Sequence, residues 1–319
     1  MNNLPCVGIV ILNFNGAQLT INCVDSVLKI DYPNFKIIVV DNASVDDSAV
    51  RLKAALTDRR VELLLNDKNE GYAGGNNRGI ERALAEGAKY IFVLNNDTIA
   101  DPGCLLPLVR FMEDDSRIAI CGGRVFNVVS NGPPSGEIER EYSLFTASRA
   151  FFCDRLDLTA PREVDHVRGT AMLLRGEAIQ KIGSFDPSFF LIWEDTDICY
   201  RARAAGYKVY LVPNPGVVHL VSQTLRKSKS TLLLYAIRNR AWFVHRHGKL
   251  RHWVVFNLYS FGYLYPRIFV GRLLRHEFKL LSPVLKGIWQ GHYGRPRPLS
   301  DDAGMFSVRV FPTDTTTHH

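Results

Sequence analysis

The sequence predicts an α/β fold in which helices flank both faces of a mostly parallel sheet. In the first part of the 319-residue chain, short apolar runs alternate with helical stretches in the order β-α-β-α-β-α-β. Three of these runs end abruptly in Asn or Asp, and ligands of open α/β sheets sit beyond the carboxyl ends of the strands. The chain is long enough for one large α/β domain and an appended segment.

The first four expected strands are short apolar runs, and the stretches between them have helical periodicity. Acids at the start of the second helix, such as Asp46 and Asp47, suit a helix N-terminus. Strands are expected at residues 7–12, 35–40, 61–65 and 90–94, and helices at residues 18–28, 46–56 and 75–86.

The second half resumes these patterns after an interruption. Periodicity fails between residues 128 and 161, where a loop is expected at residues 131–136. Gly206 suits the position just after a helix C-terminus. The later elements are strands at residues 167–174 and 209–212, and helices at residues 176–182, 195–205 and 231–247. The amphipathic residues that follow predict a C-terminal helical extension.

The formal net charge of +7 is unevenly distributed. Residues 226–297 carry many Lys, Arg and His among aromatic residues, a composition suited to nucleic acid, an anionic membrane or a phosphorylated substrate. No helix-turn-helix or RNP-like pattern is present, so nucleic acid is not an expected partner. His245, His247 and His252 lie among these basic residues and are expected at the surface.

Cysteine usage and the apolar segments bear on the compartment. The six cysteines form no C-x-x-C pair, which favours free thiols in a reducing environment. The N-terminus lacks the charged region of a signal peptide, and no window reaches the ~18 apolar residues of a spanning helix. We therefore expect a cytoplasmic protein.

Polar residues follow the first two expected strands. The first strand ends in Asn13 and Asn15, and the second ends in Asp41 and Asn42. Side chains at neighbouring strand ends share one crevice, where Asp41 could accept hydrogen bonds from a pyrimidine N–H or a ribose hydroxyl. A turn leading into a helix capped by Ser44 explains the second motif equally well.

Residues 69–79 form a glycine-rich segment, Asn-Glu-Gly-Tyr-Ala-Gly-Gly-Asn-Asn-Arg-Gly, that opens a helix. Backbone N–H groups at such a place could hold phosphate oxygens. The segment is neither G-x-G-x-x-G nor a Walker A sequence, which argues against a Rossmann dehydrogenase or a P-loop kinase. A tight turn with only a structural role is the alternative.

Carboxylates gather at two further places. The fourth strand ends in Asn95-Asn96-Asp97, which could coordinate a hard divalent cation bridged by diphosphate, although an ordinary Asn/Asp turn has the same composition. Residues 189–197 place three carboxylates in four positions behind an apolar run, and His219 follows downstream. Because clustered carboxylates repel one another, a cation, a proton or a substrate is expected to keep them together. The pattern predicts one metal-assisted active site.

Taken together, the strand-end motifs and Trp193-Glu194-Asp195-Thr196-Asp197 resemble the family 2 inverting glycosyltransferases of the GT-A fold, and most closely their rhamnosyltransferase-like branch. The resemblance covers residues 7–247, and Tyr-Ala-Ile-Arg-Asn-Arg at residues 235–240 also looks like a segment of that branch. It implies a GT-A catalytic domain, a nucleotide-binding sheet flanked by helices, followed by an amphipathic basic extension and tail. The implied bounds are residues 1–247 for the domain, with a nucleotide-sugar half at about 1–127 and an acceptor half at about 162–247, and residues 248–319 for the extension.

The resemblance also implies roles for residues of this chain. Asp195 would be the catalytic base, assisted by Glu194, and Asp97 and His219 would bind Mg²⁺ or Mn²⁺. Glu194 and Trp193 would contact the acceptor sugar, with Trp193 as a stacking floor, although a core position suits a Trp almost as well. The residues expected to bind the donor are Asn13, Asn15, Asp41, Asn42, Asn69, Gly71, Gly74, Asn76, Asn77, Asn95, Asn96, Gly169 and Thr170.

The implied reaction is metal-dependent transfer of a sugar, first of all L-rhamnose from dTDP-L-rhamnose, to a glycan or lipid-linked acceptor in surface polysaccharide assembly. One departure from the D-x-D pattern of the family is Asn95, which removes a negative charge and leaves Asp97 and His219 as the firmest metal ligands. Asp197 could instead pair with Arg201 at i, i+4.

Two alternatives stay open at this point. The basic, aromatic extension resembles an interfacial membrane patch, which would hold the enzyme peripherally on the inner membrane surface, but a homodimer contact or a helical cap on the catalytic domain explains the same composition. A catalytically silent sugar-nucleotide or glycan-binding protein of the same fold is the alternative to an enzyme. The central expectation is that the end of the fourth strand and the Trp193 stretch line one cleft.

Overall fold

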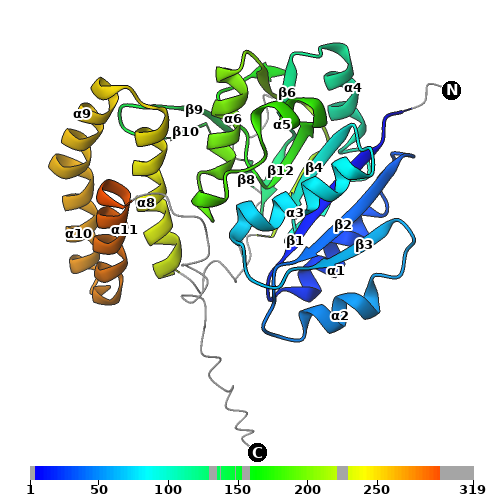
Figure 1. The fold of residues 1–319 in the computed structure, drawn as a ribbon, viewed down its shortest axis with the longest axis horizontal. Coiled ribbons are helices and arrows are strands. Elements are labelled where there is room, and N and C mark those ends of the chain that lie inside the picture. Colours follow the sequence, from blue (N-terminus) through cyan, green and yellow to red (C-terminus); the bar gives the residue numbers. More distant parts are fainter. Residues whose placement is uncertain are drawn as a thin grey trace, which may run out of the picture.

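The computed structural model describes residues 4–128, 135–136, 138–147, 149–152, 159–220 and 229–294. In this part of the chain, a large sheet with helices on both faces lies beside a group of C-terminal helices (Figure 1). The arrangement confirms the predicted α/β class and the C-terminal helical extension.

The large sheet has the strand order β11-β13-β6-β12-β4-β1-β2-β3. Its parallel half consists of β1 (Val7–Asn13), β2 (Phe35–Asp41), β3 (Val61–Leu65) and β4 (Tyr90–Asn95). β1 lies between β2 and β4, and its register pairs Asn13 with Asp41 on one side and Leu12 with Asn95 on the other. The polar ends of these three strands are therefore level at one edge of the sheet.

The other half of the sheet is mixed. β12 (Ala171–Arg175) runs antiparallel to both of its neighbours, β4 and β6 (Ile118–Gly122). β13 (Lys208–Leu211) is parallel to β6, and β11 (Arg162–Glu163) forms the edge. Because Ala171 pairs with Leu94, β12 starts where β4 ends. The residues just before β12 therefore reach the edge that carries the strand-end motifs.

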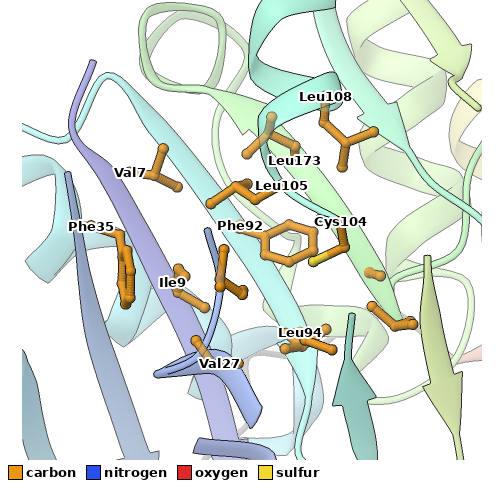
Figure 2. Packing of buried hydrophobic residues seen from close by; sticks show 14 of the residues in the cluster. Val7, Ile9, Val27, Phe35, Phe92, Leu94, Cys104, Leu105, Leu108 and Leu173 are labelled. Atoms are coloured by element: carbon orange, nitrogen blue, oxygen red, sulfur yellow. The ribbon is translucent and has the colours of Figure 1, made fainter. Parts of the chain in front are cut away.

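Successive strand residues point to opposite faces and form two apolar cores. Ile9 on β1 belongs to one core and Val10 to the other; Figure 2 shows Ile9, Phe92 and Leu105 within the first. Burial on both faces explains why these strands are continuous apolar runs. The first core is covered by α1 (Ala17–Val27), α2 (Ser48–Ala55) and α4 (Leu106–Asp114), and the second by α3 (Gly71–Ala85), α5 (Gly176–Ile182) and α6 (Glu194–Ala204).

A second, small sheet was not predicted. It consists of β5 (Thr98–Ala100), β14 (Val217–His219), β7 (Val125–Asn127) and β8 (Ser135–Gly136), in that order. Strands of two or three residues are too short to show a hydrophobic period. β14 pairs on both sides and places His219 opposite Thr98 on β5 and Asn127 on β7.

The region after residue 128 contains more structure than the expected loop. β9 (Ile138–Tyr142) pairs antiparallel with β10 (Arg149–Phe152). Of the loop expected at residues 131–136, residues 135–136 form β8, and residues 131–134 lie outside the described chain.

The C-terminal helices gather at one end of the molecule (Figure 1). They are α8 (Lys229–His247), α9 (Leu250–Tyr259), α10 (Tyr265–Leu274) and α11 (Leu281–Tyr293), with a π-helical turn η2 (Ser260–Leu264) between α9 and α10 and a 3₁₀ turn η3 (Phe278–Leu280) before α11. α11 packs closely along α8, since a Cβ at Gly291 would lie 2.9 Å from that of Ala241. Within the described residues, no helix is long and apolar enough to cross a membrane. The predicted tail after residue 294 lies outside them.

Candidate active site

A buried hydrogen-bond chain joins the ends of β1, β2 and β4. Asn13 donates from Nδ2 to Asp41 Oδ1 at 2.6 Å, and its Oδ1 accepts from the Thr20 hydroxyl at 2.7 Å. Asn96 Nδ2 donates to the same hydroxyl at 3.0 Å. Asp41 also accepts from the hydroxyl of Ser44 at 2.6 Å and from its N–H at 3.1 Å. Three predicted residues thus share one place, and Thr20, which sequence reasoning missed, connects them.

The predicted donor-binding residue Asn42 belongs to the scaffold. Its Nδ2 donates to Asn69 Oδ1 at 2.9 Å and to the Gly71 carbonyl at 3.0 Å. Its Oδ1 accepts from the Asn66 side chain at 3.0 Å and from the Glu70 N–H at 3.1 Å. An amide has two N–H groups and two lone pairs, so every position is filled within the protein. This corrects the expectation that the Asn42 side chain binds the donor.

Two further amides in α3 also hold the protein together. Asn77 exchanges two hydrogen bonds with the backbone of Phe185, at 2.7 and 3.0 Å. Asn76 donates to the Tyr72 carbonyl at 2.9 Å, one helical turn earlier. The Asn77 side chain thus holds α3 against Phe185, where the sequence predicted a donor contact. The bond of Asn76 stays within its own helix, and its buried Oδ1 has no hydrogen-bond partner among the described residues, so its donor contact stays a prediction.

α3 begins at Gly71, four residues before its predicted start. The N–H groups of Tyr72 and of the next residue donate to the Phe190 carbonyl at 2.6 and 3.2 Å. Gly74 and Gly75 are buried, and a Cβ at Gly75 would lie 2.5 Å from a β1 side chain. The expected phosphate cradle is therefore corrected: these glycines let α3 approach the sheet, and the first free N–H groups bind a protein carbonyl.

The small sheet brings His219 against Asp97. His219 Nε2 lies 3.1 Å from Asp97 Oδ1, and its Nδ1 lies 2.9 Å from Asn127 Oδ1. Because the amide oxygen only accepts, Nδ1 donates to it, and in the neutral imidazole Nε2 presents its lone pair to the carboxylate. This Nε2 is buried and forms no hydrogen bond with a described residue. A lone pair that faces a carboxylate oxygen is repulsive unless a cation or a proton joins them, so the pair fits a divalent metal.

The remaining metal ligands would not come from a larger cluster of side chains. Among the described residues, no group of three or more His, Cys, Asp and Glu could hold a metal ion. Asn95, at the first position of the D-x-D pattern, contributes a neutral amide oxygen that is buried and has no hydrogen bond within the described chain. Hard cations accept diphosphate and water oxygens readily, so a metal here would be shared between protein and substrate.

A backbone bridge joins the two acidic clusters. Asp195, in the first turn of α6, accepts from the Gly169 N–H at 3.3 Å and from the Thr196 N–H at 2.7 Å. Thr170 accepts at its carbonyl from the Asn95 N–H at 3.0 Å. Gly169 and Thr170 immediately precede β12, so the pairing of β12 with β4 sets the distance between the proposed base and the end of β4.

Tyr72 lies among the carboxylates of both clusters. Its hydroxyl donates to the Gly169 carbonyl at 2.8 Å. Removal of the phenol from water and the negative charges of Glu194, Asp195 and Asp97 raise the pKa of Tyr72 well above its ordinary value of 10. The Gly169–Thr170 backbone therefore links Tyr72, Asp195 and the end of β4 through hydrogen bonds. Tyr72 itself was not predicted, because an aromatic residue in a glycine-rich turn usually indicates packing.

The loop before Asp195 has an unusual backbone. Phe190, Ile192 and Trp193 have φ angles of 62°, 70° and 82°. Such angles cost about 1–3 kcal/mol per residue and are rarest for β-branched residues such as Ile192. Trp193 is 4% exposed, and its ring packs 5.1 Å from that of Phe243 on α8. The prediction that Trp193 forms a stacking floor for the acceptor is therefore wrong, because its ring is part of the core.

Asp197 is buried and contacted from two sides. Arg201 Nε donates to Oδ2 at 2.7 Å, which confirms the predicted i, i+4 pair, and His247 Nε2 lies 2.7 Å from Oδ1. His247 and His252 were expected at the surface, but their side chains are buried. His247 is buried because α8 packs on α6, and His252 because its ring lies 4.6 Å from that of Phe145. A linear pattern of basic residues reveals neither contact.

Comparison with known proteins gives three kinds of match. A sequence profile described as Glycosyl transferase family 2 matches residues 8–183. The chain is 28% identical over 172 residues to the low-salt glycan biosynthesis hexosyltransferase Agl10 of Haloferax volcanii, over 52% of this chain and 52% of that protein. It is 26% identical over 123 residues to an uncharacterized glycosyltransferase of Haemophilus influenzae, over 38% and 37% of the two chains. The matched part thus spans about half the length of Agl10.

Two solved structures share the fold. The mannosyltransferase PcManGT from Pyrobaculum calidifontis, in complex with GDP-Man and Mn²⁺, superposes with a TM-score of 0.58 at 13% identity over 92% of this chain and 89% of that chain. GalNAc-T7 with UDP, GalNAc and Mn²⁺ gives a TM-score of 0.55 at 17% identity, over 83% and 57% of the two chains. At such identities the likeness shows a common GT-A fold.

Proposed function

The chain belongs to glycosyltransferase family 2, and on that premise we propose that it transfers a sugar from a nucleoside diphosphate to an acceptor hydroxyl. The observation that carries the proposal is the backbone bridge between the two acidic clusters, in which Gly169 donates to Asp195 and Thr170 accepts from Asn95 at the end of β4. Inverting transfer requires one group that removes the acceptor proton and another that stabilises the departing diphosphate. The two acidic clusters supply candidates for both tasks within one site.

Asp195 is the proposed general base. Its oxygens are fixed by the N–H groups of Gly169 and Thr196, yet the residue keeps 9% of its surface exposed. An acceptor hydroxyl within hydrogen-bond reach would give its proton to Asp195 while its oxygen bonds to the anomeric carbon and the carbon–diphosphate bond breaks. Attack opposite the leaving group inverts the anomeric centre. Glu194, the neighbour of Asp195 in the first turn of α6, would orient the acceptor.

Asp97 and His219 would hold Mg²⁺ or Mn²⁺, and the bound ion would act as a Lewis acid toward the departing diphosphate. The 3.1 Å approach of the buried His219 Nε2 to the Asp97 carboxylate supports this assignment. Because Asn95 is neutral, the protein supplies one negative charge fewer than a site with two Asp residues. We therefore expect tight metal binding only together with the donor.

Asp41 would recognise the nucleotide. Its carboxylate is 2% exposed and accepts three hydrogen bonds from Asn13 and Ser44, which leaves one acceptor position for a base N–H or a ribose hydroxyl. For the sugar we propose L-rhamnose from dTDP-L-rhamnose, as in the rhamnosyltransferase-like branch. The motifs at residues 95–97, 193–197 and 235–240 support this choice of donor.

The extension after residue 247 is proposed to contact an anionic membrane surface, next to a lipid-linked acceptor. Residues 250–274 contain no Asp or Glu and three arginines. A surface helix normally turns polar residues to water, but the outer side of α9, η2 and α10 is apolar, which suits an interface with lipid. The exposed apolar residues on it include Leu250, Val254, Leu258, Phe261, Val270 and Leu274.

A product assay tests the proposed function. The full chain is incubated with a panel of nucleotide sugars, dTDP-L-rhamnose first, with Mg²⁺ or Mn²⁺ and a lipid-linked or glycan acceptor. We expect a glycosylated product and an equal amount of nucleoside diphosphate. Donor binding without turnover would support a catalytically silent binding protein, and the absence of donor binding would contradict both readings.

A further inference from the structure

The strained loop that leads into Asp195 is held by one amide on α8. Asn239 is completely buried, and its Nδ2 lies 2.7, 2.8 and 2.7 Å from the carbonyl oxygens of Phe189, Leu191 and Ile192. Two N–H groups therefore serve three acceptors. These carbonyls belong to the stretch in which Phe190 and Ile192 have positive φ, a shape that points the carbonyls toward α8.

Arg238 fixes the orientation of this amide. Its Nε donates to Asn239 Oδ1 at 2.8 Å, so the amide oxygen faces the guanidinium and the NH₂ group faces the loop. The guanidinium lies 4.3 Å and 4.1 Å from the ring centroids of Tyr235 and Trp242. Its Nη2 also donates to the carbonyls of the 3₁₀ turn η1 (Pro187–Phe189) region, at 3.1 Å each.

The opposite side of the loop is held by α3. The Phe190 carbonyl accepts from the N–H groups of Tyr72 and Ala73, so it points away from α8. Successive carbonyls of the loop therefore bind opposite partners: that of Phe190 binds α3, and those of its two neighbours bind Asn239. Three residues after Ile192 comes Asp195, in the first turn of α6, so the conformation of the loop fixes the entry point of the helix that carries the base.

We propose that Asn239, oriented by Arg238, is a positioning residue for the proposed base Asp195. This inference rests on the proposed function. Without the amide donors, the carbonyls of Leu191 and Ile192 would lose the hydrogen bonds from Asn239, and that of Phe189 would keep only those from Arg238 and the Leu191 N–H. The loop would then relax toward negative φ, and the first turn of α6 would shift. The donor side, built on the ends of β1 and β2, would stay in place because the hydrogen bonds of Asp41 come from Asn13 and Ser44, and neither residue lies on α8. Loss of Asn239 should therefore reduce turnover and spare donor binding.

Asn239→Asp is the sharpest test, because it keeps the shape of the side chain and replaces the NH₂ donor by an acceptor. We expect kcat to fall about 100-fold, the effect of a misplacement of about 1 Å. The donor Kd should stay within about threefold of wild type. Asn257→Ala on α9 is the matched control: within the described residues that amide donates to the Trp253 carbonyl of its own helix alone, and kcat should be unchanged.

Hydrogen exchange gives a readout that does not depend on turnover. In Asn239→Asp, the amides of residues 188–198 and of Tyr72 and Ala73 should exchange faster, and those of β1 and β2 should not change. Asn239→Ser, with one hydroxyl donor, should lie between wild type and Asn239→Asp in both measurements, and it decides the question if Asn239→Asp does not fold.

Three results would overturn the inference. One is a folded Asn239→Asp or Asn239→Ser variant with kcat within about threefold of wild type. Another is a parallel loss of donor binding and kcat, which indicates a general structural role. The third is faster exchange throughout the chain. If wild type itself transfers no sugar from any donor, the proposed function fails; if wild type transfers and Asn239→Asp transfers equally well, only this inference fails.

Discussion

The two sides of the active site are built in different ways. On the donor side, Asn13 and Asp41 stand opposite each other on adjacent parallel strands, and the register of the sheet alone brings them to 2.6 Å. On the base side, Asp195 follows a strained loop whose shape depends on α3 and on Asn239 of α8. The position of the donor-binding residues is thus set by the sheet, and the position of the proposed base is set by contacts between distant helices. Substitutions on one side should change binding, and those on the other should change turnover.

Asp195→Asn should have the largest effect. The amide keeps the size of the carboxylate but cannot take the acceptor proton, so we expect transfer to fall about 10³-fold or more, within the usual range for a lost general base. The donor Kd should stay within a few-fold. Initial rates and donor titration calorimetry measure both quantities, with exposed Asp25→Asn on α1 as the control. Full activity in Asp195→Asn would reject Asp195 as the base, and the base side of the site would then no longer account for turnover.

Asp97→Ala should impair both donor binding and turnover, because this residue lies between the two sides. Its carboxylate faces His219 Nε2 at 3.1 Å, and its loss removes the only charged oxygen of the proposed metal pair. We expect kcat/KM to fall about 100-fold, with weaker donor binding and a higher metal requirement, as for loss of a Lewis acid that contacts the donor. His219→Gln should behave in the same way. EDTA should abolish transfer by wild type, and added Mn²⁺ should restore it. If EDTA leaves the transfer rate of wild type unchanged, the metal proposal is wrong.

The same contrast decides what the sequence could predict. Asp41 and Asp97 end apolar strands, so a local pattern is enough to place them at one edge of a sheet. Trp193 has no such pattern: its burial depends on Phe243 of α8, about fifty positions away, and the prediction for it was wrong. Asn239 sits inside a helix between Arg238 and Arg240, where its partners on a distant loop cannot be read from spacing. The approach of His219 to Asp97 requires three-residue strands that carry no period.

Asp41→Asn should sharpen the comparison from the donor side. The amide keeps the side-chain shape but removes the negative charge and turns one acceptor into a donor that faces the Ser44 N–H or Asn13 Nδ2. We expect the donor Kd to rise about tenfold, the value of one charge-assisted hydrogen bond, and kcat at saturating donor to stay near wild type. A titration of nucleoside diphosphate gives the Kd. A fall in kcat with unchanged Kd would show that the two sides are not separable.

His292→Gln should have the smallest effect: it should change the pH dependence of stability and leave donor binding and turnover unchanged. Burial lowers the pKa of His292 in α11 to about 4 from its ordinary value of 6.5, and its Nε2 lies 2.7 Å from the Tyr265 hydroxyl. Between these values the unfolded chain binds a proton that the folded chain does not, so His292 favours the folded state fully above pH 6.5 and progressively less as the pH falls toward 4. When the pH is lowered from 7.5 to 5, the Tm of wild type should fall by a few degrees more than that of His292→Gln. Gln retains an acceptor for Tyr265, so the hydrogen bond is kept. If the melting temperatures of the two proteins depend equally on pH, His292 does not titrate with folding. A change in the donor Kd would show that α11 influences the donor side.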